Sequence, residues 1–252
     1  MVMSKSHPLF SVMLAVPVLW IMAPTLPAKD RDMKIVGAFS SARPGDSLPE
    51  NWKPLTFRDI EKRTEYALVQ DGGTTVLLAQ ADASASALIR EVRVDPQEYP
   101  IIQWRWKVNH VLEKGDVHRK SGDDYPARIY ITFELELSKL NFFEKLLYEA
   151  IKLIYGRYPP SKAINYIWAN KAPISTMVPN AYTEKAMMFV LQSGENKLNQ
   201  WVQEERNVYK DYKQAFGTEP PAISGVAVMT DTDNTGESAK AHYGDILFKP
   251  EG

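Results

Sequence analysis

The sequence ISGVAVMTDTDNTGESAKAHYGDILF, from Ile223 to Phe248, contains two apolar runs joined by an acidic loop. Short apolar runs that are bounded by turn residues are typical of β-strands. We therefore expect closing strands over Ile223–Met229 and His242–Phe248. The acidic loop between them and the pair Gly244–Asp245 fit either tight turns or a cation site.

Two stretches nearer the middle of the chain alternate strictly between apolar and polar residues. In Ile101–Val108 and in Ala127–Leu135 every second side chain is apolar, which predicts strands that are buried on one face. Trp104 and Trp106 lie on the apolar face of the first stretch, and we expect both in the core.

Turn and helix signals complete the pattern. Thr64–Gln70 and Thr75–Gln80 flank two glycines and predict a hairpin, while Asn141–Tyr155 and Tyr209–Phe216 have helical spacing. About nine short strands at regular spacing favour a mainly β fold. The sequence thus predicts an antiparallel β-sandwich, jelly-roll-like, with one or two inserted α-helices. The other expected strands are Ser86–Val94, Ala163–Ala169, Ala186–Ser193 and the beginning of Trp201–Phe216.

Charge and composition exclude several classes of function. The chain has 31 acidic and 30 basic side chains, so its net charge of -1 provides no long-range field to attract nucleic acid or another polyanion. It contains no cysteine, which excludes disulfides, a thiol nucleophile and a cysteine zinc site. The sequence also lacks HExxH, GxSxG, GxGxxG and a phosphate-binding loop, so zinc hydrolase, serine esterase, dinucleotide and kinase functions lack their motifs.

The N-terminus has the pattern of a targeting segment. Lys5 precedes an apolar run from Leu9 to Ala23, and Ala28 ends a small-residue site, so we expect a signal peptide over residues 1–28. Residues 29–54, rich in Pro, Gly and Ser, are expected to be irregular, and residues 55–252 to form one domain. The expected location is periplasmic or secreted, with no stable membrane insertion after cleavage. The alternative is an uncleaved segment that anchors the protein to the inner membrane.

Several motifs together resemble an exported bacterial family known as domain of unknown function 3047. That family implies no established activity. The final pattern of strand, acidic loop and Gly-Asp-Ile also resembles jelly-roll, galactose-binding-like modules, which implies glycan binding. The motifs are WRWKV (Trp104–Val108), GDDYPARIYITF (Gly122–Phe133), INYIWA (Ile164–Ala169), EERNVYKDYKQAFG (Glu204–Gly217) and MTDTDNTG (Met229–Gly236).

Arginine and aromatic residues on the polar strand faces form the first candidate site. Arg105 and Arg128 are expected on neighbouring strands, with Tyr130 and Trp168 as stacking platforms and Asp123 nearby. Guanidinium donors bind oxygen while an aromatic plane covers the apolar C–H groups of a sugar, so this set predicts a binding face for a glycan or small polar ligand. The alternative is that the arginines form ordinary cross-strand ion pairs.

Acidic residues near the C-terminus form a candidate calcium site. Asp231 and Asp233 match the start of an EF-hand loop, and Asp245 could complete a looser site. The twelfth position, however, is His242 where an EF-hand has a bidentate Glu. The alternative is an Asx-rich turn whose side chains satisfy the amides of the loop itself.

Three functions remain in competition. The first is a non-catalytic β-sandwich that binds a glycan or small polar ligand. The second is a polysaccharide hydrolase or lyase that uses two carboxylates, for which Asp124 and Glu205 are the candidates. The third is a structural protein of the cell envelope whose polar strand faces carry only ion pairs.

Overall fold

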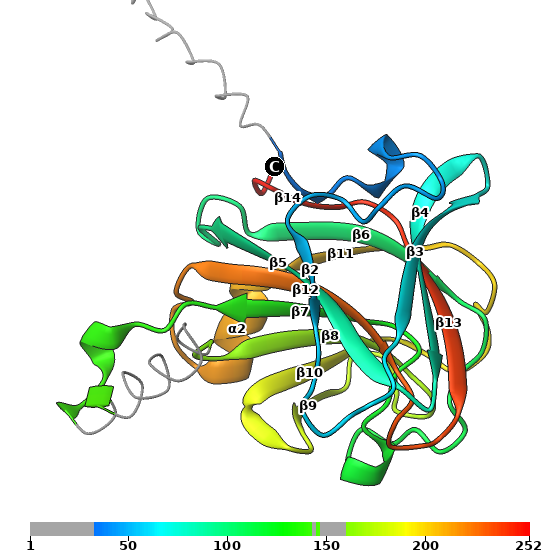
Figure 1. The fold of residues 1–252 in the computed structure, drawn as a ribbon. Helices are drawn as coiled ribbons and strands as arrows, with labels where there is room; N and C mark the ends of the chain where they lie inside the picture. The colour runs from blue at the N-terminus through cyan, green and yellow to red at the C-terminus, as the bar shows by residue number, and fades with distance from the viewer. Residues whose placement is uncertain (1–32, 143–144, 147–159) are drawn as a thin grey trace, which may run out of the picture. The chain divides into compact units, whose positions relative to one another are not determined.

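The structure is a computed structural model that describes residues 33–142, 145–146 and 160–252. Its strands form two sheets (Figure 1). The expected signal peptide and most of the expected helix Asn141–Tyr155 lie outside the described residues. No helix within the described ranges is long and apolar enough to cross a membrane.

The first sheet, sheet A, is antiparallel and is organised around β6. A further strand, β11, pairs with β6 on the edge that the other neighbours leave free. The order along the sheet is β1 (Lys34–Gly37), β14 (Ile246–Lys249), β6 (Ile101–Val108), β13 (Ser238–Tyr243), β4 (Thr74–Asp82) and β3 (Glu65–Asp71), with β11 (Val202–Asn207) beside β6.

The second sheet, sheet B, contains the other strands of the sandwich. Its pairs are antiparallel except for β8 and β10, which run parallel. The order is β2 (Trp52–Leu55), β5 (Ala85–Val94), β12 (Ile223–Asp231), β7 (Arg128–Phe133), β8 (Ala163–Ala169), β10 (Thr183–Ser193) and β9 (Met177–Asn180).

The core lies between the two sheets and is rich in aromatic rings. Trp104 of sheet A stacks on Tyr166 of sheet B with ring centroids 5.3 Å apart, and Trp106 meets Trp168 edge to face at 6.1 Å. All four rings are buried, which confirms the predicted core position of the two β6 tryptophans. Aromatic pairs of this kind add to the stabilisation from area burial.

Local signals in the sequence explain the hairpin and the helix. Gly72 and Gly73, at φ values of 58° and 81°, form the predicted turn between β3 and β4. Helix α2 (Val208–Phe216) begins after Asn207, whose side chain accepts a hydrogen bond from the Lys210 amide, and ends at Gly217 with φ of 69°. Short 3-10 helices occupy Phe39–Ser41, Lys120–Gly122 and Leu137–Lys139.

The predicted fold class is confirmed, with two local corrections. The leading segment 29–54 is not wholly irregular, because it includes β1 and the beginning of β2. The expected strand His242–Phe248 is also interrupted: β13 ends at Tyr243 and β14 begins at Ile246.

This interruption divides sheet A. Both β13 and β14 pair with β6, one after the other, with His242 opposite Lys107 and Leu247 opposite Gln103. On their other edges β13 continues to β4, whereas β14 continues to β1 (Figure 1). The sheet therefore forks at Gly244–Asp245, next to the middle of β6.

Candidate functional site

The structure separates the two arginines that the sequence places on neighbouring strands. Arg105 lies on β6 in sheet A, and Arg128 lies on β7 in sheet B. The sequence predicted correctly which side chains of each strand are apolar and face the core. The two strands belong to different sheets, however, and each sheet packs its apolar face against the other. The polar faces of β6 and β7 consequently point in opposite directions, so the two arginines do not form one clamp.

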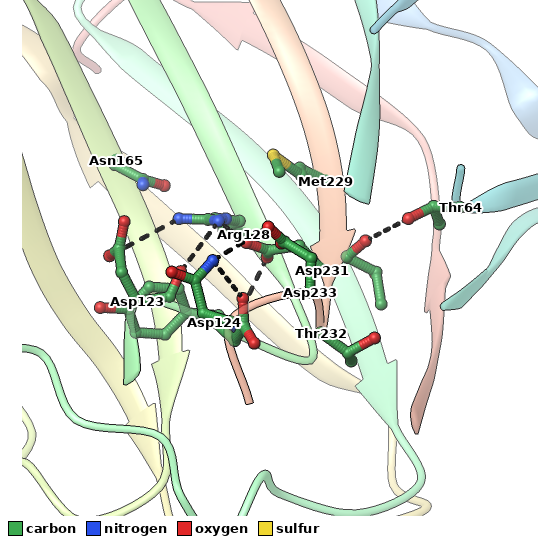
Figure 2. A network of polar contacts seen from close by, with 12 residues as sticks. Thr64, Asp123, Asp124, Arg128, Asn165, Met229, Asp231, Thr232 and Asp233 are labelled. Carbon is green, nitrogen blue, oxygen red and sulfur yellow. Dashed lines mark hydrogen bonds and ion pairs between the residues drawn. The ribbon is translucent and has the colours of Figure 1, made fainter. Parts of the chain in front are cut away.

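Arg128 is the centre of a buried ion-pair network at the end of sheet B (Figure 2). Its side chain is only 3% exposed and is paired with the Asp231 carboxylate. Nη2 also donates to the Asp123 carbonyl at 3.3 Å, and the Asp123 carboxylate lies 3.9 Å from Nη1. The rings of Tyr125 and Tyr130 lie 4.9 and 5.5 Å from the guanidinium carbon.

The network is closed to solvent and only partly satisfied. Within the described residues, Nε and Nη1 of Arg128 and Oδ1 of both Asp123 and Asn165 have no hydrogen-bond partner. Burial lowers the pKa of Arg128, but Tyr130 and Asp123 outweigh it and the net shift is upward. This arrangement matches the ion-pair alternative for Arg128 better than a surface clamp.

The predicted stacking platforms also lie elsewhere than expected. Trp168 is fully buried in the core, and its Nε1 donates to the Gly194 carbonyl at 3.1 Å, so the ring is not available to a ligand. Tyr130 is half-buried and packs beside a small apolar cluster on the outer side of sheet B. Asp123 is buried and accepts a hydrogen bond from the Asn180 amide at 2.9 Å.

Three carboxylates beside Arg128 form the acidic group that comes nearest to the predicted metal site. Oxygen atoms of Asp124, Asp231 and Asp233 all lie within 4.8 Å of one another. Asp245 is not a member, because it accepts hydrogen bonds from the amide and hydroxyl of Ser40, which lies in the 3-10 helix Phe39–Ser41.

Donors from the protein already bind each of these carboxylates. Asp124 accepts from the Thr235 amide at 2.7 Å, Asp231 from the Tyr125 amide at 3.3 Å, and Asp233 from the Asn234 side chain at 3.1 Å. Burial raises the pKa of Asp233, and the charge of Asp124 raises it further. The first two contacts join the 231–236 segment to residues 124–125, so these carboxylates accept from amides of a neighbouring segment and not only from their own loop.

Arg105 lies in a second polar environment, on the outer face of sheet A at the fork. An open groove of about 540 Å³ lies farther along this face, and one of about 280 Å³ lies at Arg105 itself. The Arg105 groove is lined mainly by side chains that donate or accept hydrogen bonds: Ser40, Thr74, Gln103, Arg105, Gln203 and Asp245, together with Leu247.

The Arg105 side chain is fixed from two sides. Its guanidinium carbon lies 4.5 Å from the centroid of the Trp201 ring. On the other side it crosses Gly244, where an added Cβ would lie 2.5 Å from Cγ and 2.7 Å from Nε of Arg105. Arg105 makes no ion pair with any described residue, and the carboxylate that shares its groove, Asp245, is bound to Ser40.

Asp71, at the tip of the β3–β4 hairpin, holds Trp201 in this position. Its Oδ2 accepts from Trp201 Nε1 at 2.8 Å and from Lys107 Nζ at 2.5 Å. The hydrogen bond from Lys107 is the main cause that lowers the pKa of Asp71. The sequence reasoning did not select Trp201, although a tryptophan among the polar residues Asn199, Gln200 and Gln203 was an available signal.

The two candidate catalytic acids lie on different sheets. Asp124 is buried beside the end of β7, whereas Glu205 lies on β11 in sheet A and accepts from Lys249 at 2.7 Å. The structure does not bring these two carboxylates together, and glycoside hydrolysis requires two acids on either side of one bond.

Comparison with known proteins identifies the family. Residues 50–247 match the model of the family described as protein of unknown function (DUF3047), and the chain belongs to that family. No curated protein sequence matches the chain.

Remote similarity extends to solved carbohydrate-binding structures. A family 29 carbohydrate-binding module is 8% identical, with coverage of 87% of this chain and 92% of that one and a TM-score of 0.34. The carbohydrate recognition domain of Emp47p is 9% identical, with coverage of 87% and 98% and a TM-score of 0.43. The family 30 module of a Clostridium thermocellum cellulosomal cellulase is 11% identical, with coverage of 88% and 95% and a TM-score of 0.36. Similarity this remote does not identify a ligand.

Proposed function

We propose that this protein is a non-catalytic binding β-sandwich that holds a glycan or small polar ligand in the Arg105 groove. The observation that carries the proposal is the guanidinium of Arg105, which is fixed between Trp201 and Gly244 and paired with no described carboxylate. A charged donor that is ordered before binding loses little conformational entropy when a ligand arrives.

The surrounding groups define the chemistry of the ligand. The planar guanidinium donates two parallel hydrogen bonds to a carboxylate or to paired oxygens. Gln103 and Gln203 line the same groove and can each donate and accept, as sugar hydroxyls do. The groove therefore favours a polar ligand that carries oxygen on several sides, and an acidic sugar fits best.

The proposed location is the periplasm or the exterior of the cell. It rests on the signal-like composition of residues 1–28. A fusion of residues 1–28 to a reporter that is active only after export tests this location, and retention of the reporter in the cytoplasm would contradict it.

The binding proposal is tested with a panel of neutral and acidic glycans. Arg105→Gln removes the charge and is expected to weaken binding by about 10- to 150-fold, because a hydrogen bond to a charged group contributes roughly 1.5–3 kcal/mol. Lys53→Gln makes the same charge change at an exposed position of sheet B and is expected to leave binding unchanged. Failure of the wild-type protein to bind any glycan, or equal binding by the Arg105 variant, would contradict the proposal.

A further inference from the structure

The outer face of sheet A carries a strip of basic side chains that extends beyond the Arg105 groove. Arg105 and Lys107 are two apart on β6, and Lys240 and His242 are two apart on β13, so each pair shares a face. His242 pairs directly with Lys107 across the two strands, which places all four side chains on one face. We call these four residues the basic strip.

The larger groove lies at the far end of this strip. It has a volume of about 540 Å³ and is lined by Lys240 together with Arg63, Asn109 and His110. Asn109 and Lys240 are held together, since the Asn109 amide donates to the Lys240 carbonyl at 3.1 Å and the Lys240 amide donates to Asn109 Oδ1 at 2.9 Å. The basic strip thus connects two polar grooves.

Positive charge in the strip exceeds the negative charge that neutralises it. Asp71 pairs with Lys107, but neither Arg105 nor Lys240 makes an ion pair with a described residue. Lys107, which lies opposite His242, is therefore compensated, and the charges of the strip without an ion-pair partner among the described residues are those at its two ends, Arg105 and Lys240. Burial lowers the pKa of His242, and the charges of Lys107 and Lys240 lower it further.

Acidic side chains balance the far groove only in part. Glu65 and Asp82 also line it, and Asp82 lies 4.0 Å from Lys62 across an exposed ion pair. Arg63 makes no ion pair among the described residues. An anionic ligand would pair with the cations that have no ion-pair partner in the described part of the chain. The net charge of -1 for the whole chain does not reveal this local excess of positive charge.

The distance between the two grooves sets the size of that ligand. Arg105 and Asn109 are four residues apart on β6 and its extension, which corresponds to about 13 Å at roughly 3.3 Å per residue. A single sugar cannot contact both ends, whereas an oligosaccharide can. We propose that the outer face of sheet A binds an extended acidic glycan, with carboxylates at Arg105 and at Lys240; this inference rests on the proposed function.

A glycan suits this surface better than a nucleic acid does. Amide and hydroxyl side chains line both grooves, and they match the hydroxyls of a sugar chain. Nucleic-acid binding draws on a broad basic field and on free aromatic platforms for the bases, whereas Trp201 already stacks on Arg105.

The experiment compares ligands of increasing length on the full chain. Binding of galacturonic acid, its short oligomers and polygalacturonate is measured, with dextran as the neutral polymer and single-stranded DNA as the other polyanion. The longer oligomers are expected to bind at least tenfold more tightly than the monomer. Lys240→Gln is expected to weaken oligomer binding by about 2- to 5-fold, as for a solvent-exposed charge contact, and to leave monomer binding unchanged.

The outcomes separate this inference from the function on which it rests. Suppose that the monomer binds in an Arg105-dependent way, but longer oligomers bind no more tightly and Lys240→Gln has no effect. This result would overturn the extended site, and the proposed ligand site in the Arg105 groove would still stand. Absence of binding to every sugar tested, acidic or neutral, would overturn the proposed function itself. Tighter binding of DNA than of polygalacturonate, or equal binding of dextran, would overturn the choice of an acidic glycan. The control variant Lys53→Gln removes one positive charge from sheet B, as Lys240→Gln does from sheet A. It is expected to bind every ligand as the wild-type protein does.

Discussion

Replacement of Arg128 by Met is expected to destabilise the fold strongly. The side chains of Arg128 and Asp231 are 3% and 1% exposed, so the variant leaves a buried carboxylate without its cation. Loss of one partner of a buried ion pair costs roughly 3–5 kcal/mol. For a domain of this size that corresponds to a fall in melting temperature of about 6–20 °C.

Urea unfolding and thermal melting of matched variants measure this effect. Arg105→Met makes the same chemical change on the outer face of sheet A, where loss of the charge is expected to cost less than about 1 kcal/mol. Adding Asp231→Asn to Arg128→Met removes the stranded charge and is expected to restore part of the lost stability. An Arg128→Met protein with wild-type stability and impaired glycan binding would refute the structural role assigned to Arg128.

Three further predictions concern the fork and the acidic group. Gly244→Ala places a Cβ against Arg105 Cγ and Nε, so the arginine must move, and the variant is expected to weaken glycan binding at least about tenfold. Wild-type affinity would show that the arginine need not be fixed. Because burial and Asp124 raise the pKa of Asp233, its stabilising contribution is present at low pH and is lost as pH rises through the folded-state pKa. Asp233→Asn is therefore expected to increase the free energy of unfolding at neutral pH by less than about 1 kcal/mol and to have little effect at low pH. A lower free energy of unfolding at neutral pH would argue against repulsion between the Asp233 and Asp124 carboxylates. A chelator is expected to leave the melting temperature unchanged, since protein donors already bind the three carboxylates; a lower melting temperature that calcium restores would identify a cation site.

Alternation in the sequence predicted β6 and β7 but not their partners. The spacing of Trp104 and Trp106 predicts which side of β6 is buried, because the period of a strand is a local property. The pairing of β6 with β14, β13 and β11 joins residues that are far apart in the chain, and no local pattern contains it. For this reason the sequence placed Arg105 and Arg128 on neighbouring strands, when they lie on opposite outer faces.

The candidate sites show the same division between local and long-range information. Asp231 and Asp233 are two residues apart in the sequence and remain together, whereas their third neighbour, Asp124, comes from a loop more than a hundred residues earlier. Trp201 meets Arg105 only because β11 pairs with β6, so its role could not be derived from its own surroundings. The overall net charge likewise conceals the basic strip, since composition records how many charges are present and not where they lie.

The position of a bound acidic oligosaccharide tests the central claim most directly. A crystal structure of the protein with an oligomer of galacturonic acid is expected to show a ligand carboxylate within hydrogen-bonding distance of the Arg105 guanidinium, on the outer face of sheet A beside Trp201. A ligand bound instead on the outer face of sheet B, against Tyr130, would contradict it.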